Sequence, residues 1–142
     1  MRRSCCVTWR GRVLGRLLIG SFAMLGVSAA MAAEKGFPYE QELMLDARPM
    51  KGSKRVPMME ITRKGETAID LWCNKVQAQL VVVEDTITVL AGTVTEEKCL
   101  PERMRADEEL IAALVAVTNW RRDGDVLMLR GAKTLRFRTA TH

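Results

Sequence analysis

The stretch TAIDLWCNKVQAQLVVVEDTITVL, residues 67–90, decides the fold because it predicts three consecutive β-strands. Apolar and polar side chains alternate over residues 67–73, 77–83 and 86–90, which is the period of a strand with one buried face. Residues 84–85 (ED) separate the last two runs and are enough for a hairpin turn. The stretch therefore predicts an antiparallel β-meander.

Similar alternating runs lie on both sides of this meander and extend the predicted sheet. They predict further strands over residues 41–45, 56–62, 118–122, 125–130 and 134–138. Pro57 confines the second of these runs to an edge or to the start of a strand. Asp123-Gly124 is a favoured two-residue hairpin turn between the runs on either side of it.

One helix is predicted after the meander, because apolar residues recur there at helical spacing. The apolar stripe consists of Leu110, Ile111, Leu114 and Val117. Pro101 suits the first turn, and the acids at residues 107–109 suit the N-terminal end, where the helix dipole favours negative charge. We expect the helix to run from about residue 102 or 106 to residue 117. The predicted fold class is α+β, a small, mostly antiparallel sheet or open barrel with one packed helix.

The first 32 residues predict a secretory signal peptide. A basic region up to Arg16 precedes an apolar stretch over residues 17–27, and Ala30 and Ala32 fit the A-x-A cleavage pattern. We expect cleavage after Ala32 and one domain over residues 37–142, in a monomeric protein that is periplasmic or secreted. The apolar stretch is shorter than the ~20 residues of a spanning helix. An uncleaved N-terminal anchor is the alternative.

The basic residues are distributed unevenly along the chain. The sequence has 22 Lys and Arg, 17 Asp and Glu, and a formal net charge of +5. Five of the arginines and none of the acids lie in residues 1–33, so the remainder balances 17 basic residues against 17 acidic ones. A neutral domain lacks the long-range field that attracts phosphates, and we therefore expect no nucleic acid among its partners.

Two cysteines, Cys73 and Cys99, would remain after cleavage, since Cys5 and Cys6 leave with the signal peptide. In an oxidising compartment such a pair predicts one disulfide. Closing that loop contributes roughly 3–4 kcal/mol in the chain-entropy model. A reactive thiol is the alternative, but the only histidine, His142, lies at the C-terminus and offers no nearby base.

No set of residues in the mature sequence predicts catalysis, a metal site or a cofactor. A Ser-His-Asp triad has only Ser53 and His142 to draw on, and no CxxC or HxxxH pair supplies zinc ligands. The acids at residues 107–109 could form a carboxylate cluster, although a helix start explains them. The methionines are candidate Cu(I) ligands or core fillers, with no Met-x-x-Met repeat to favour copper. These methionines are Met44, Met50, Met58, Met59, Met104 and Met128.

Two tryptophans and three loop cations are candidates for a binding surface. The tryptophans lie on predicted strands and either pack in the core around the disulfide or form an exposed pair on a binding face. The cations lie in a predicted solvated loop over residues 48–55 and could contact an anionic envelope surface. The candidates are Trp72, Trp120, Lys51, Lys54 and Arg55.

Three segments carry a family resemblance: residues 70–74 (DLWCN), 93–99 (TVTEEKC) and 109–114 (ELIAAL), the last followed by Trp120 and a turn. From about residue 66 onward their order resembles the META domain, the fold of the heat-shock protein HslJ and its exported bacterial relatives. The family's Thr-x-Met-x-Cys segment lacks its Met here, and no glycine precedes Cys73. The resemblance implies a small sheet-and-helix domain of the bacterial envelope in which the two cysteines are structural. No enzymatic activity or cofactor is established for this fold, so the resemblance supplies no catalytic residues.

The resemblance also gives a direction for function, because family members are associated with heat response, motility, secretion and novobiocin resistance. We expect a non-enzymatic META-like domain with a role in envelope integrity or stress response, whose partner is an envelope protein or surface. The alternative is an inhibitor of a hydrolase, such as lysozyme or a protease, that acts through the loops at residues 48–55 and 93–101.

Overall fold

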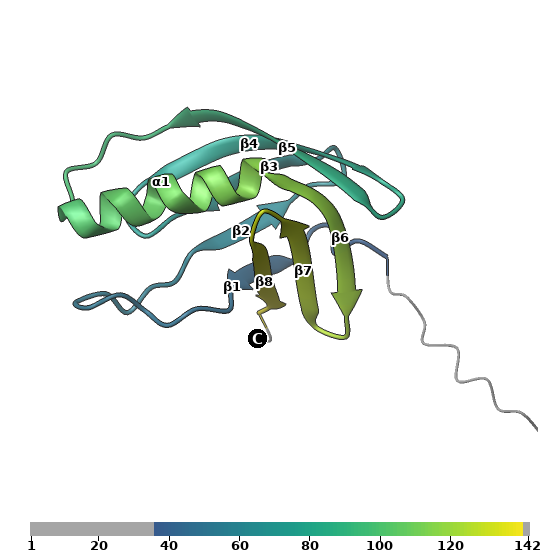
Figure 1. Ribbon diagram of the computed structural model, residues 1–142, viewed down its shortest axis with the longest axis horizontal. Coiled ribbons are helices and arrows are strands. Elements are labelled where there is room, and N and C mark those ends of the chain that lie inside the picture. The colour runs from purple at the N-terminus through teal and green to yellow at the C-terminus, as the bar shows by residue number, and fades with distance from the viewer. Residues whose placement is uncertain (1–35, 141–142) are drawn as a thin grey trace, which may run out of the picture. The chain divides into compact units, whose positions relative to one another are not determined.

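A computed structural model of the chain describes residues 36–140, which form an antiparallel eight-stranded barrel and one helix (Figure 1). The predicted signal peptide, residues 1–32, lies outside the described residues. The strands are β1 (Glu42–Leu45), β2 (Met58–Ile61), β3 (Glu66–Asp70), β4 (Lys75–Val83), β5 (Thr86–Val94), β6 (Val117–Asp123), β7 (Val126–Gly131) and β8 (Thr134–Thr139). The helix α1 (Pro101–Val115) connects β5 to β6. No helix among the described residues is long and apolar enough to cross a membrane.

The barrel is closed, whereas the sequence predicted a sheet or an open barrel. Each strand pairs with its neighbours in chain order, and β1 also pairs with β8, where Leu43 lies opposite Thr139. This pairing removes the two free edges that an open sheet would have. All eight predicted strands are present, which confirms the antiparallel meander and the single helix.

The contact between β5 and β6 is the narrowest seam of the barrel. Its register contains one pair, Thr86 and Asn119, although β5 continues to Val94. The helix packs against β5 and β7, and Figure 1 shows it lying along the barrel beside β5. The helix therefore covers the region that backbone pairing leaves open.

The core is built from the inward-facing residues of every strand together with one face of α1. Burying one Val, Leu, Ile, Met or Phe side chain stabilises the fold by about 1.5–3 kcal/mol. The core residues are Leu43, Met59, Ile61, Ile69, Leu71, Val76, Leu80, Ile87, Val89, Leu110, Leu114, Val117, Leu127, Leu129 and Phe137. Met59 is thus a core residue, as the gap-filling interpretation of the methionines predicted, but that interpretation is wrong for Met44 and Met104, which expose 37% and 42% of their surface.

The sequence predicted that the acids at residues 107–109 lie at the N-terminal end of α1. This prediction is wrong. The helix begins at Pro101 and carries Glu102 in its first turn, so residues 107–109 lie within it. Asp107 is buried, with 2% of its surface exposed, while Glu108 and Glu109 face solvent. A carboxylate in this position needs hydrogen-bond donors from another element.

The predicted turn between β6 and β7 is displaced by one residue. Asp123 pairs with Val126, so the two-residue turn consists of Gly124 and Asp125 rather than Asp123 and Gly124. Gly124 has φ 58°, a conformation that glycine adopts without steric cost at the first position of such a turn.

Candidate functional site

Asp107 of α1 holds the connection between β3 and β4. Its Oδ1 accepts the backbone N–H of Trp72 at 2.8 Å and of Cys73 at 3.2 Å. Its Oδ2 accepts the backbone N–H of Asn74 at 2.8 Å and the side-chain Nδ2 at 3.1 Å. Hydrogen bonds to an ionised acceptor are stronger than neutral ones, and four of them compensate the burial of this carboxylate.

This arrangement also explains why Trp72 is not on a strand, contrary to the sequence prediction. β3 ends at Asp70, because the Leu71 N–H donates to the Asn74 carbonyl and the Trp72 and Cys73 N–H groups donate to Asp107, so none of them pairs with a neighbouring strand. The predicted run over residues 67–73 was therefore too long at its C-terminal end.

Asn74 connects the same segment to the connection between β5 and α1. Its Oδ1 accepts the backbone N–H of Glu97 at 2.8 Å and the hydroxyl of Thr95 at 3.2 Å. The predicted disulfide between Cys73 and Cys99 is present and joins the same two connections, with its Cα atoms 6.2 Å apart. We call Asp107, Asn74 and this disulfide the Asp107 clamp.

The two candidate tryptophans lie at opposite ends of β4. Trp72 is half-buried beside the clamp, before the first residue of the strand. The Trp120 indole donates to the carbonyl oxygen of Glu84, just after the last residue, at 2.7 Å, and packs edge-on against Phe37. The strand has nine residues, which corresponds to about 30 Å at ~3.3 Å per residue. The two indoles therefore do not form a pair.

The three candidate cations lie at the clamp end of the barrel. Lys51, Lys54 and Arg55 are exposed in the connection between β1 and β2. A Cβ atom at Gly52 would lie 3.6 Å from Nη2 of Arg103, which places this connection against the start of α1. We call the end formed by residues 46–57, 71–74 and 95–100 the loop end. Figure 1 shows the connection between β1 and β2 and the start of α1 at the left of the view.

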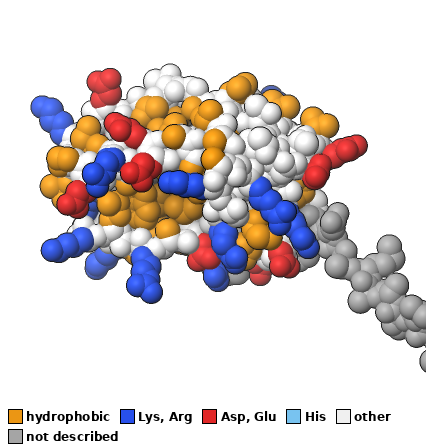
Figure 2. All heavy atoms as spheres, in the orientation of Figure 1, with side chains coloured by type: hydrophobic (Ala, Val, Ile, Leu, Met, Phe, Trp, Pro, Cys, Tyr) orange, Lys and Arg blue, Asp and Glu red, His pale blue; other side chains and the backbone are white. Residues whose placement is uncertain are grey.

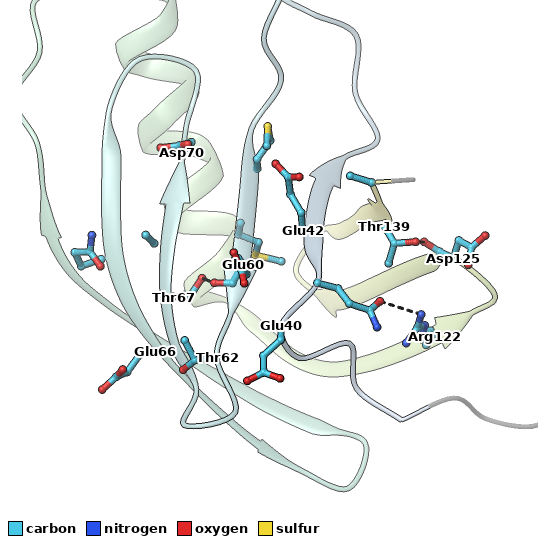
Figure 3. A pocket seen from close by; sticks show the side chains of 16 residues that line it. Glu40, Glu42, Glu60, Thr62, Glu66, Thr67, Asp70, Arg122, Asp125 and Thr139 are labelled. Atoms are coloured by element: carbon cyan, nitrogen blue, oxygen red, sulfur yellow. Dashed lines mark hydrogen bonds between the residues drawn. The ribbon is translucent and has the colours of Figure 1, made fainter. Parts of the chain in front are cut away.

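A groove of about 1020 Å³ lies on the outer wall of the barrel over β1, β2 and β3 (Figure 3). Glu42 lies opposite Glu60 and Glu60 opposite Ala68, so a short side chain lies next to long acidic ones. The acids that line the groove are Glu40, Glu42, Glu60, Glu66, Asp70 and Asp125. Arg122 is the one cation among the lining residues.

Two of these acids are already paired with cations on the barrel surface. Lys75 contacts Asp70 at 2.8 Å and Arg63 contacts Glu40 at 2.9 Å, in exposed pairs. Glu60 and Glu66 make no ion pair among residues 36–140. The groove can therefore attract cations, although no group of metal-ligating side chains occurs in this part of the chain.

The groove could not be predicted from the sequence, because its acids lie on outward positions of different strands. Glu42, Glu60 and Glu66 are isolated in the sequence and come together only through the register of β1, β2 and β3. Alternation predicts which residues face outward, but it does not predict which of them lie side by side.

Comparison with known proteins gives a family and a fold. The META domain family matches residues 30–142. A protein solved by NMR is 15% identical with a TM-score of 0.55, over 70% of this chain and 89% of that chain. A DUF4847 family protein from Bacteroides vulgatus is 10% identical with a TM-score of 0.55, over 73% of this chain and 95% of that chain. No curated protein matches the sequence. At these identities the solved structures show similarity of fold alone.

Proposed function

Because the chain belongs to the META domain family, we propose that it acts as an exported, non-enzymatic domain in envelope integrity or stress response. The observation that carries this proposal is the disulfide between Cys73 and Cys99. Disulfides persist in the periplasm and in secreted proteins and are rare in the cytosol. The signal peptide predicted over residues 1–32 supports the same compartment.

The state of Asp107 supports the non-enzymatic part of the proposal. A catalytic acid or base must come within hydrogen-bond distance of the substrate. The Asp107 carboxylate is buried, and four N–H groups of residues 72–74 already occupy it. Its position fits a structural role for Asp107.

A gene deletion tests the proposed role directly. We expect the deletion strain to be more sensitive to heat, detergent or novobiocin than its parent, and the full-length gene to restore resistance. A gene lacking codons 2–32 is the matched control, because its product would remain in the cytoplasm and is expected not to restore resistance. Parental behaviour of the deletion strain under all three treatments contradicts the proposal.

The mass of the natively produced protein tests the compartment. We expect a chain that begins close to Ala33 and is two hydrogen atoms lighter than its reduced form, because Cys73 and Cys99 are oxidised. A full-length chain with four thiols that react with an alkylating reagent contradicts export.

Inhibition of a hydrolase is a second candidate, and the arrangement of the loop end favours it. The connection at residues 46–57 approaches Arg103 in the first turn of α1, which directly follows the connection at residues 95–100, and Leu100 exposes 60% of its surface. Inhibition assays against a panel of lysozymes and proteases test this candidate. Full hydrolase activity at saturating protein contradicts it.

A further inference from the structure

Exposed apolar side chains lie beside the cations of the loop end. Leu100 exposes 60% of its surface and Met104 exposes 42%. Leu100 directly precedes α1 and Met104 lies in its first turn, where the Met104 N–H donates to the Leu100 carbonyl at 3.2 Å, so both lie at the same end of the helix. Gly52 lies close enough to Arg103 that a Cβ atom at Gly52 would be 3.6 Å from its Nη2, so the cationic connection approaches the same turn of α1.

The charge of the loop end comes from one connection. Residues 46–57 contain four cations, Arg48, Lys51, Lys54 and Arg55, and one acid, Asp46, which is already paired with Arg136 and Arg138 of β8. Residues 95–100 add Glu96, Glu97 and Lys98, so the loop end as a whole has five cations and three acids. Figure 2 shows Lys and Arg side chains projecting along the lower left edge, below an apolar patch. Because residues 34–142 are neutral in total, this excess is compensated elsewhere, including the acidic groove.

We propose that the loop end docks onto the surface of an anionic lipid bilayer. This inference rests on the proposed function and names the envelope surface that the domain contacts. Leu100 and Met104 enter the boundary between headgroups and acyl chains, while the four cations contact anionic headgroups. Trp72 lies at the same end, and indole rings are favoured at this depth of a bilayer. The uneven charge orients the barrel with its loop end toward the membrane.

Co-sedimentation with lipid vesicles tests the proposal. The protein is produced by export and its N-terminus is verified by mass, so that every sample carries the same processed chain. We expect binding to vesicles of equal parts phosphatidylglycerol and phosphatidylcholine, weaker binding as salt is added, and no binding to phosphatidylcholine alone.

Charge variants show which surface binds. Lys51→Gln with Lys54→Gln is expected to lower the affinity about 25-fold, since each cation near a bilayer contributes about fivefold. The matched control is Lys64→Gln with Arg121→Gln, which removes the same charge from exposed residues outside the loop end and leaves affinity close to that of the unmodified domain.

Apolar variants test the insertion of α1. Leu100→Gln with Met104→Gln is expected to lower the affinity about tenfold, because the inserted apolar area is lost. Val83→Gln is the control, since Val83 also exposes 60% of its surface but lies beside the turn between β4 and β5. Thermal melts establish that each variant is folded.

Three outcomes overturn the proposal: no binding to anionic vesicles, equal effects of the loop-end variants and their controls, or hydrolase inhibition through the same loops without lipid binding. Failure of the inference and failure of the proposed function are separate results. A deletion phenotype without lipid binding overturns only the inference, and lipid binding without any phenotype overturns only the role in the envelope.

Discussion

Asp107 is buried and accepts four hydrogen bonds, whereas Glu60 and Glu66 lie exposed in the groove without an ion pair among residues 36–140. The three side chains carry the same chemical group. Their surroundings differ, because converging backbone N–H groups replace water around Asp107 while the groove leaves its carboxylates solvated. The comparison teaches that the donors around an acid, and not the number of acids, decide its contribution to stability.

The largest expected effect is that of Asp107→Ala. Removing the carboxylate leaves backbone N–H groups of Trp72, Cys73 and Asn74 without their acceptor, and we expect a loss of about 3–5 kcal/mol in the free energy of unfolding. Urea denaturation of the oxidised protein measures it. Glu108→Ala, at the exposed neighbouring position, is expected to change stability by less than about 0.5 kcal/mol. Equal losses of stability for the two variants would show that the hydrogen bonds of Asp107 to residues 72–74 do not stabilise the fold.

The double substitution Cys73→Ser with Cys99→Ser separates the covalent part of the clamp from its hydrogen bonds. We expect a loss of about 2–4 kcal/mol with the fold retained, because Asn74 still joins both connections. Circular dichroism and urea denaturation measure fold and stability. Combining this change with Asp107→Ala should give a loss that differs from the sum, since both act on the same connections. If the Cys73→Ser, Cys99→Ser variant is unfolded, the disulfide, and not the hydrogen-bond network, holds the loop end together.

Glu60→Gln removes one of the exposed carboxylates of the groove, and we expect it to increase the free energy of unfolding. Like charges directly opposite each other on neighbouring strands are unfavourable, and Glu60 lies opposite Glu42. We expect a gain of about 0.2–1 kcal/mol at low ionic strength that decreases with added salt. Glu66→Gln is the control, because Glu66 faces the neutral Gln79. A gain that is equal in the two variants, or one that salt does not reduce, contradicts this explanation.

The smallest expected effect is that of Asp70→Asn. This change removes the 2.8 Å ion pair with Lys75, in which both side chains are more than half exposed. We expect a loss below about 0.5 kcal/mol, since exposed ion pairs contribute little. A thermal melt measures it, and a loss comparable to that of Asp107→Ala would break the contrast between the two regions.

The strands could be predicted from the sequence because each is specified locally. Alternation of apolar and polar residues over a few positions reports which side of a strand is buried, and the core residues Ile69, Ile87 and Phe137 follow it. Closure of the barrel could not be predicted in this way. It depends on pairing between β1 and β8, which lie at opposite ends of the described chain.

The clamp was identified only in part. The cysteine pair was predicted from its number and compartment, but the role of Asp107 was not, because its donors lie 33 to 35 positions away in the sequence. The acids at residues 107–109 looked equivalent, and only the orientation of α1 distinguishes the buried one. A buried position in a helical pattern that holds an acid is the signal that could have identified it.

Pairing of β1 with β8 also imposes an order of assembly on the barrel. Synthesis delivers the chain from its N-terminus, so β1 emerges first while its partner, residues 134–139, emerges last. Until then one side of β1 is an unpaired edge, which can pair with other chains. Contacts between such distant segments form slowly. The interval before β8 arrives is therefore the period in which a nascent chain is most exposed to misassembly.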